Sequence, residues 1–514
     1  MKIPTAVASA LAVTLALTGC PEDRTPPGRA KPRPPQAVIA AGAATLPDAV
    51  TLLRPHEPEW FGLYLVGKKA GFSRVQVSRE LREGRDVLVS RSEMLVRAKV
   101  GGKQVERRQE EERVYEARPA GPLLSFRTAW RGDGGDRTLV GSCAKAVCRV
   151  EEEAGGGARS ERVVEGVTET AELADAARLA ASRRGTVRGR QLDTEKLRMR
   201  EVQAVFQRRE VISGAGVSEE VSLVSESEPG DRLAAEYKIS DDGRIVEMRM
   251  GEAIVALPEP AEKAQRLDEV DLFALARVAL PRELPRTVPA TVVYTLQGLP
   301  PAFHRNDARQ RFERAKGGTS LLTVTARTPL AANPAKDTPL ARAKAGADAD
   351  DLAATPQFDS GAPQVARLAQ DVTAGSKGTY EAAGKLLDEV HRRLGKIYGA
   401  SRDRASDVLA AGQGDCTEHA VLFVALARAA GIPARAQLGL VAATYADGQP
   451  ALYWHAWAEV RSAGEWIAMD PIFGQHVADA THVGFGEYLG RGQADAVGLL
   501  GALKVVSVEV KPAK

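Results

Sequence analysis

The sequence has little net charge, few cysteines and only one long apolar segment. Lysines and arginines number 70 against 67 aspartates and glutamates, which leaves a net charge of +3 over 514 residues. This balance gives no indication of nucleic-acid binding, which favours strongly basic chains. Beyond the N terminus no segment is apolar enough to span a bilayer, so we expect the rest of the chain to be soluble. The length predicts two or three domains.

The apolar segment lies at the N terminus. Residues 6–17 carry no charge and lead into Leu17-Thr-Gly-Cys20. This pattern predicts a signal peptide over residues 1–19, because the stretch is too short for a membrane span. Leu-Thr-Gly-Cys is also the bacterial lipobox pattern, so we expect Cys20 to carry lipid. A cleaved signal with a coincidental cysteine is the alternative.

A proline-rich segment follows Cys20. Six prolines lie within residues 21–35, which predicts an extended tether over residues 20–58. The tether would hold the folded part away from a membrane that faces the periplasm. We favour the outer membrane because no aspartate follows Cys20. The expected partners are that membrane, through the lipid anchor, and a protein or peptide substrate of the cell envelope.

Only four cysteines are present, as suits an oxidising compartment. Cys143 and Cys148 flank a predicted tight turn between two strand ends, which favours a disulfide. A metal pair is the alternative, but no histidine lies near them in sequence. Cys416 is then left unpaired in a chain that looks exported, and it requires another explanation.

The pattern of residues 59–260 predicts an antiparallel β-rich domain, with short alternating runs separated by turn residues such as Asp242-Gly243. One helix is expected around residues 170–182. No catalytic grouping stands out here, so this domain is a scaffold, a binding module or a spacer. Residues 261–328 predict a small β unit, and residues 329–359 predict a linker. Residues 360–514 form the last predicted domain.

Cys416 lies where a buried helix is predicted to begin. Asp415 is a favourable N-cap residue and Glu418 completes a capping box. The helix is apolar on nearly all sides and ends at Gly431-Ile-Pro433. Its free N–H groups and dipole favour thiolate, so we expect a thiol pKa well below 8.5. Asp415 and Glu418 oppose this, so a nearby imidazolium is required.

A predicted β-hairpin supplies that imidazole. Residues 451–460 alternate as a strand that places His455 on one face, and a second strand ends at Asp470. A loop centred on Ser462-Ala463 sets His455 directly opposite Asp470, with Cβ atoms about 5 Å apart. The carboxylate then orients the imidazole while its other nitrogen meets the thiol. A loop one residue longer or shorter would place the two side chains on opposite faces.

Taken together, these motifs resemble the core of the transglutaminase-like superfamily, relatives of papain-type cysteine enzymes. The resemblance covers roughly residues 360–490 and follows Gly414-Asp-Cys416, Arg428-Ala-Ala-Gly-Ile-Pro-Ala-Arg435, Trp454-His-Ala-Trp-Ala-Glu-Val460 and Trp466-Ile-Ala-Met-Asp-Pro471. It implies an α+β fold, with a papain-like core of helices packed on an antiparallel sheet. It also implies that Cys416 is the nucleophile, His455 the general base and acid, and Asp470 the orienting residue. The N-terminal β region is similar to the domain that precedes this core in some bacterial lipoproteins.

The second oxyanion donor is not assigned by these motifs. The family usually has a polar side chain upstream of the nucleophile, but Gln413 is too close to Cys416 and Tyr398 is only a candidate. The Cys416 N–H is expected to be one donor, and loss of the second would cost about 3 kcal/mol. We expect His419 to be structural or pocket-lining, and His391, His476 and His482 to be ordinary surface or loop histidines.

Three functions follow from these patterns. The first is a cysteine-dependent amide or peptide hydrolase, or a transamidase, of which we favour the hydrolase because water is abundant in the periplasm. The second is an inactive transglutaminase-like scaffold or binding lipoprotein. The third is a structural envelope lipoprotein that acts through its β domain. No calcium-loop pattern is evident and a Cys/His/Asp zinc site would have only three ligands, so we expect no metal or cofactor.

Overall fold

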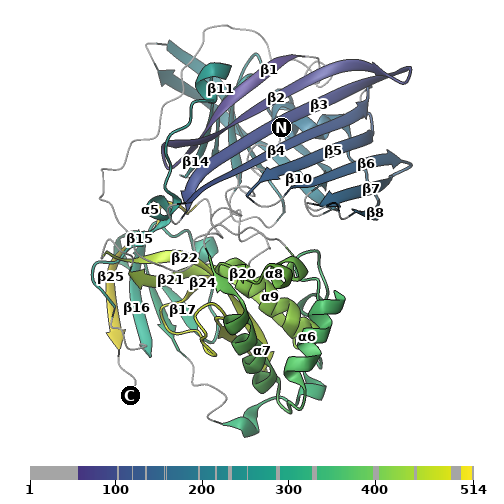
Figure 1. The fold of residues 1–514 in the computed structure, drawn as a ribbon. Coiled ribbons are helices and arrows are strands. Elements are labelled where there is room, and N and C mark those ends of the chain that lie inside the picture. The colour runs from purple at the N-terminus through teal and green to yellow at the C-terminus, as the bar shows by residue number, and fades with distance from the viewer. Residues whose placement is uncertain are drawn as a thin grey trace. The chain divides into compact units, whose positions relative to one another are not determined.

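The computed structural model describes residues 56–511, with gaps at 101–102, 119, 134–135, 155–156, 158, 195–196, 215–216, 230–233, 252, 285–289, 327–332, 398–403, 445–448 and 488–498. The predicted signal peptide, Cys20 and nearly all of the tether lie outside the described residues. The chain divides into two compact units (Figure 1). The N-terminal unit ends at Val270, and the C-terminal unit begins at Asp271 and also takes in Lys99–Lys103.

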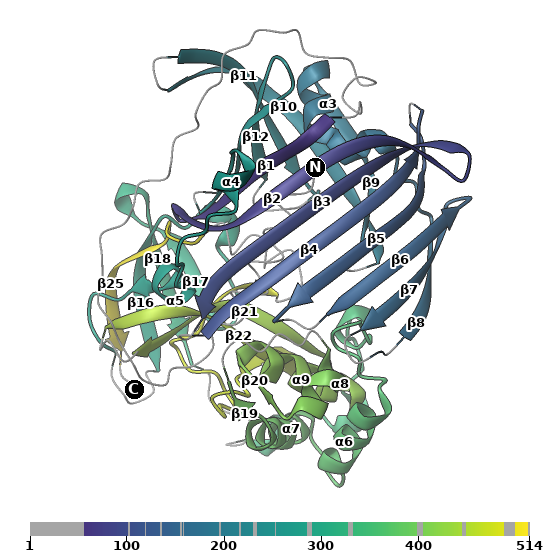
Figure 2. The same ribbon diagram turned by 45° about the horizontal axis from the view of Figure 1, so that its top comes forward.

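The N-terminal unit is built on one fourteen-stranded sheet whose neighbouring strands mostly follow each other in the chain (Figure 2). The order is β8-β7-β6-β5-β4-β3-β2-β1-β14-β13-β12-β11-β10-β9, so β1 and β14 join two runs of hairpins. The predicted antiparallel β-rich domain is confirmed. The strands are β1 (His56–Leu65), β2 (Lys68–Arg82), β3 (Arg85–Val100), β4 (Lys103–Glu116), β5 (Leu123–Gly132), β6 (Arg137–Ala144), β7 (Val147–Ala154), β8 (Arg159–Glu165), β9 (Thr186–Asp193), β10 (Arg198–Gly214), β11 (Val217–Ser227), β12 (Ala235–Ser240), β13 (Ile245–Met250) and β14 (Ile254–Pro258).

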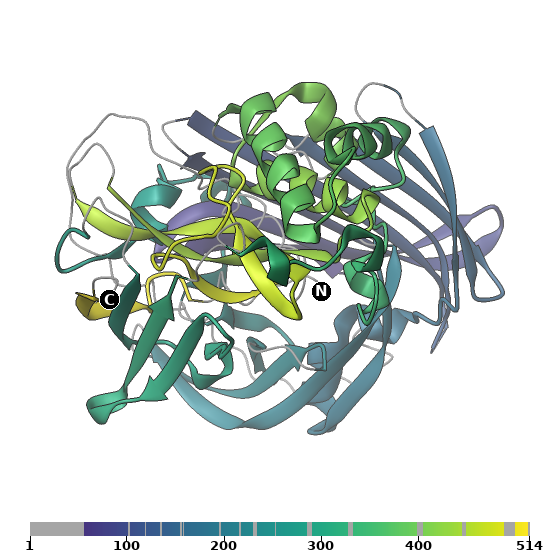
Figure 3. The same cartoon turned by 90° about the horizontal axis from the view of Figure 1, so that it is seen from below.

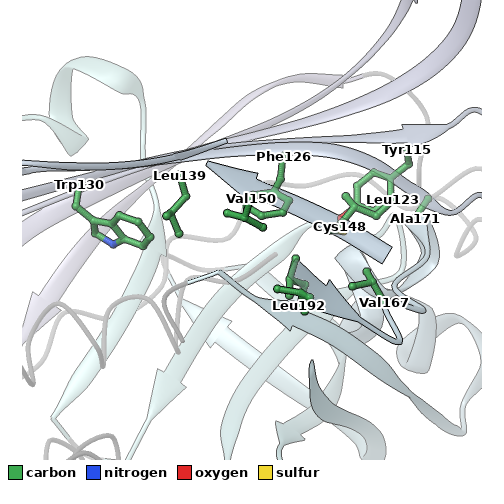
Figure 4. Close-up of a cluster of buried hydrophobic side chains, with 11 residues drawn as sticks. Tyr115, Leu123, Phe126, Trp130, Leu139, Cys148, Val150, Val167, Ala171 and Leu192 are labelled. Carbon is green, nitrogen blue, oxygen red and sulfur yellow. The ribbon is translucent and has the colours of Figure 1, made fainter. Parts of the chain in front are cut away.

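Alternation along these strands builds the core of the unit. Figure 4 shows side chains such as Phe126, Leu139 and Val150 gathered on one side of the sheet. Cys148 belongs to this cluster and is joined to Cys143 by a disulfide between directly opposed residues of β6 and β7. The helical segment predicted near residue 170 is a 3-10 turn, η1 (Ala171–Asp175), followed by α3 (Ala176–Arg183).

An ion network is buried in the same unit. The Arg113 side chain is 3% exposed and donates to Glu111 Oε1 at 2.7 Å and to Glu169 Oε2 at 2.6 Å. Tyr115 donates to the other Glu169 oxygen, and the Leu192 N–H also donates to Glu169. Burial opposes the charge on Arg113, but the two carboxylates outweigh it and raise its pKa well above the ordinary value. Because every member is partnered, this network is a structural element of the fold.

The C-terminal unit packs helices on an antiparallel sheet. Helix α9 (Cys416–Ala429) lies against β21 (Ala434–Thr444) and β22 (Pro450–Ser462), with α6 (Pro363–Thr373), α7 (Thr379–Arg393) and α8 (Ala405–Ala411) around it. Figure 3 shows these green helices beside the yellow-green strands. The sheet order is β15-β22-β21-β24, and β23 (Glu465–Met469) also pairs with β22; β15 is Val278–Ala279 and β24 is Val483–Glu487. This is the predicted α+β arrangement.

A second sheet of this unit extends the small β unit predicted over residues 261–328. It contains β16 (Thr291–Gln297), β17 (Gln310–Arg314) and β18 (Thr319–Thr325), and β25 (Lys504–Lys511) near the C terminus pairs with β16. The segment predicted as a linker over residues 329–359 also contributes to the unit. Its Asp337 carboxylate accepts the N–H groups of Tyr380 and Glu381 in the first turn of α7.

Candidate active site

The start of helix α9 has the predicted capping box. Asp415 Oδ1 accepts the Thr417 N–H at 2.9 Å, and Glu418 Oε2 accepts the Asp415 N–H at 3.0 Å. These two bonds fix the first helical residue at Cys416. Every residue from Cys416 to Arg428 is buried, because the apolar helix is surrounded by α6, α7, α8 and the sheet.

The Cys416 sulfur meets β22 at an opening in its strand pairing. On one side, β22 pairs with β15 at Ala451 and Leu452 and with β23 from Ala458 onward. Between these two pairings, the backbone N–H of Ala456 lies where it acts on the sulfur as a hydrogen-bond donor and lowers the Cys416 pKa. Ala456 directly follows His455, so the helix start brings the thiol to the histidine's own segment of the strand.

His455 and Asp470 are joined by a hydrogen bond from His455 Nε2 to Asp470 Oδ2 of 2.7 Å. Both side chains are almost fully buried, and the Phe473 ring stacks on the imidazole with 4.9 Å between centroids. Because the carboxylate binds Nε2, Nδ1 is the nitrogen available to act on a thiol.

The hairpin register differs from the prediction. The turn is Ala463-Gly464, with φ angles of 53° and 77°, so Ser462 opposes Glu465 and Met469 opposes Ala458. Asp470 is therefore displaced by two residues from the position directly opposite His455. A shift of two residues preserves the face, and the side chains still meet diagonally.

The Asp470 carboxylate is saturated with hydrogen bonds. Its Oδ1 accepts the N–H groups of Ile472 at 2.9 Å and Phe473 at 3.0 Å, while Oδ2 accepts from His455 and from His482 Nε2 at 3.0 Å. Burial opposes ionisation of this carboxyl, but the two imidazoles outweigh it and hold its pKa well below its usual range.

His482 was predicted to be an ordinary surface or loop histidine, and that prediction is wrong. Its side chain is fully buried and reaches the same Asp470 oxygen as His455. Its partner lies twelve residues earlier across a loop, where no periodicity links the two positions. His476, in contrast, is partly exposed and pairs with Asp388 at 2.7 Å. His391 Nδ1 lies 3.1 Å from the Pro471 carbonyl oxygen, beside the loop that follows Asp470.

Residues 366–471 match the family model of the transglutaminase-like superfamily. This stretch is a transglutaminase-like domain. It contains Cys416, His455 and Asp470, whereas His482 lies beyond its matched end. No curated protein matches the chain.

Three solved structures share weaker likenesses with the chain. A candidate cysteine protease from Cytophaga hutchinsonii is 17% identical at a TM-score of 0.30, covering 44% of this chain and 83% of its own. A β-barrel-like protein of unknown function from Brucella abortus is 12% identical at 0.31, covering 40% and 96%. A candidate protease from Parabacteroides distasonis is 12% identical at 0.20, covering 69% and 68%.

The thiol of the transglutaminase-like domain is not a resting thiolate. Burial raises the pKa of Cys416 well above its ordinary value, the carboxyl groups of Asp415 and Glu418 raise it further, and the Ala456 N–H only partly offsets them. The expected pKa below 8.5 is therefore wrong. The sequence predicts a buried helix, but the expected pKa was based on the helix dipole and an imidazolium and left out the cost of burying the charged thiolate.

The carboxyl pair beside the thiol also departs from ordinary ionisation. Burial, followed by the neighbouring Glu418, raises the pKa of Asp415 well above its usual range. His419 donates from Nδ1 to the Asp415 carbonyl oxygen at 2.7 Å, and burial lowers its pKa to about 4, so it is neutral. Its Nε2 has no hydrogen-bond partner among the described residues, which fits the predicted structural or pocket-lining role better than a role as base.

The residues considered as oxyanion donors are Gln413, Tyr398 and the Cys416 N–H. Gln413 is exposed on the two-residue strand β20 (Gln413–Gly414), which pairs in parallel with β19 (Gly395–Lys396). Tyr398 lies outside the described residues. The Cys416 N–H, in the first turn of α9, remains the predicted first donor.

His455, Asp470 and His482 also form the one group within the described ranges whose ligand atoms lie close enough together for a metal ion, within 4.8 Å of one another. Their separations from Asp470 Oδ2 are 2.7 and 3.0 Å. Ligand atoms around a tetrahedral zinc ion, with bonds of about 2.0 Å, lie roughly 3.3 Å apart. The observed separations are those of direct hydrogen bonds.

Proposed function

We propose that Cys416 is the nucleophile of an acyl-transfer enzyme acting on amide or peptide bonds, with His455 as base and acid and Asp470 as the residue that orients it. The observation that carries this proposal is the 2.7 Å bond between His455 Nε2 and Asp470 Oδ2, on a strand whose next residue, Ala456, lowers the Cys416 pKa through its backbone N–H. This arrangement supplies a nucleophile, a base and an orienting group in one place.

The reaction begins from a neutral thiol. His455 Nδ1 takes the thiol proton as the sulfur attacks the carbonyl carbon, and Asp470 stabilises the imidazolium that forms. The carbon–nitrogen bond then breaks, and the imidazolium gives its proton to the departing amine. The thioester is opened by water or by a second amine, whose proton returns to His455 before the thiol is regenerated. We favour water as the acceptor because it is far more abundant than an ordered amine.

The alternative function is a binding scaffold without turnover. The buried thiol with its raised pKa favours this alternative, because such a thiol resists ionisation. The saturated Asp470 and its contact with His455 favour the enzyme, because a scaffold has no need for an oriented imidazole.

We also propose that the protein is a lipoprotein of the cell envelope, anchored through Cys20 and acting on an envelope protein or peptide. In the part of the chain that the structure describes, no helix combines the length and the apolar character needed to cross a bilayer. Palmitate labelling in a bacterial host tests the anchor. Labelling that persists in a Cys20→Ala variant would contradict it.

Fluorescein-labelled casein, with and without biotin-cadaverine, tests the reaction. Hydrolysis releases small fluorescent peptides, and transamidation attaches biotin to casein. We expect the wild-type protein to show at least one of these products and Cys416→Ala to show neither. Equal activity of the two proteins would overturn the role of Cys416. Absence of both products from the wild type, combined with an unreactive thiol, would favour the scaffold.

A further inference from the structure

His482 lies between two carboxylates in the C-terminal unit. Its Nε2 is 3.0 Å from Asp470 Oδ2, and its Nδ1 is 3.2 Å from Asp479 Oδ1. The imidazole is fully buried, so both of its nitrogens are shielded from bulk solvent. Neither carboxylate oxygen has a proton to donate when ionised, so each nitrogen must supply one.

Both carboxylates are held in the ionised form. Asp470 accepts two backbone N–H groups in addition to its two imidazoles. Asp479 accepts the N–H and hydroxyl of Thr481 on Oδ1 and the Gln475 amide on Oδ2. Burial raises the pKa of Asp479, but His482 and Thr481 outweigh it and hold this pKa well below its usual range.

The other groups around the ring are few. His455 lies 5.6 Å away between ring centroids, and the Trp457 and Phe473 rings stand nearly perpendicular to the His482 imidazole. Arg309 reaches the loop from the start of β17, where it donates to the carbonyl oxygens of Asp479 and His482. Burial lowers the His482 pKa, but Asp470 and Asp479 outweigh it and raise it above 6.5.

We infer that His482 is a buried imidazolium and a positioning residue, which holds the same Asp470 oxygen as His455 and balances its charge. The resulting order of charges is Asp479 negative, His482 positive and Asp470 negative, and His455 binds the same Asp470 oxygen. This order sets the electrostatic environment in which the Cys416 thiol ionises. Without the positive charge on His482, the charge on Asp470 would be uncompensated and would raise the pKa of Cys416 further.

The charge is tested directly by NMR on protein with 15N-labelled histidine, in a Cys416→Ala background that cannot react. We expect both ring nitrogens of His482 to remain protonated at pH 7.5, with the signals assigned by their loss in His482→Gln. A ring with one unprotonated nitrogen at that pH would overturn the inference. So would metal-bound imidazole signals together with zinc retained by the purified protein. Neither readout depends on catalysis.

The consequence for the site, which rests on the proposed function, is tested by the pH dependence of Cys416 alkylation with iodoacetamide. We expect His482→Gln to move the profile to higher pH by about one unit, and therefore to slow alkylation about tenfold near pH 7. The matched control is His476→Gln, which removes an exposed histidine from its pair with Asp388 and should leave the profile in place.

The outcomes separate the two proposals. A lower melting temperature with an unmoved pH profile would show that His482 is only structural. An imidazolium seen by NMR together with alkylation that is insensitive to His455→Ala would retain the charge on His482 and reject the catalytic role of Cys416.

Discussion

Cys416 is the residue whose chemistry depends most on its immediate neighbours. The helix start offers N–H groups that favour thiolate, while burial and two carboxyl groups within one turn oppose it. Burial and the two carboxyl groups dominate in the resting protein, so in the proposed mechanism the sulfur ionises by passing its proton to His455. The proton therefore leaves the thiol during the reaction and not before it.

Replacing Glu418 by Gln tests how far the Glu418 charge raises the Cys416 pKa. Gln keeps an oxygen that can accept the Asp415 N–H but removes one source of negative charge. We expect a lower Cys416 pKa and alkylation about three- to tenfold faster at pH 7. The control is Glu381→Gln, which makes the same change in the capping box of α7. An unchanged rate in Glu418→Gln would show that the charge of Glu418 does not contribute to the raised Cys416 pKa.

Sequence reasoning placed Cys416 at a helix start and His455 on the same sheet face as Asp470, because a cap, a strand alternation and a hairpin each constrain one position. It missed His482 because loop residues follow no period. It also assigned the wrong direction to the Cys416 pKa, since it left out the cost of burying the charged thiolate.

At the scale of elements, the site depends on how closely strands approach. A Cβ at Gly439 of β21 would lie 1.9 Å from the Val483 carbonyl oxygen of β24 and 2.7 Å from the Trp457 ring. We expect Gly439→Ala to destabilise the C-terminal unit by about 1–3 kcal/mol in urea unfolding, because backbone must move. Gly361→Ala, where a Cβ meets nothing within 4 Å, is the control. Equal losses of unfolding free energy in the two variants would contradict the close approach of β24 to Gly439.

The buried network of the N-terminal unit provides a second test at this scale. Glu169→Gln removes a charge that Arg113 contacts at 2.6 Å, and we expect a loss of about 3–5 kcal/mol from the stability of that unit. Glu153→Gln, at an exposed pair 3.8 Å from Arg159, should change stability by less than about 1 kcal/mol. A negligible effect of Glu169→Gln would show that the network tolerates the lost charge.

The individual strands and helices were largely predictable from sequence, but the exact register and the long-range pairing of the strands were not. Hairpins of the N-terminal sheet follow from local alternation and turn residues, as does the α9 capping box. The exact turn of the β22–β23 hairpin was not fixed by sequence, because Ser462-Ala463 and Ala463-Gly464 are both short loops that keep the same face. The pairing of β25 with β16 spans some two hundred residues, and no local pattern reports it.

At the scale of the whole molecule, the ionisable groups predict how stability varies with pH. The folded pKa of His482 is raised above 6.5, so its contribution is complete below about pH 6.5 and is lost as pH rises through the folded value. Asp415, whose folded pKa is raised, also stabilises the fold at low pH and loses this contribution as pH rises above about 4. Asp470 and Asp479, whose folded pKa values are lowered, stabilise the fold above about pH 4 and lose this contribution in acid.

We therefore expect the unfolding free energy of the C-terminal unit to fall between pH 6.5 and pH 9. His482→Gln should flatten that decline, and urea unfolding at several pH values measures it. A decline of the same slope in the variant would assign the pH dependence to other groups.

The most direct test of the whole account is the iodoacetamide alkylation rate of Cys416 at pH 7 in the wild type and in His455→Ala, followed by mass spectrometry of the modified peptide. The account predicts that the variant reacts at about one tenth of the wild-type rate or below, because its thiol has lost the group that takes the proton. Equal rates in the two proteins would show that the imidazole does not act on the sulfur, and would contradict the proposed catalytic triad.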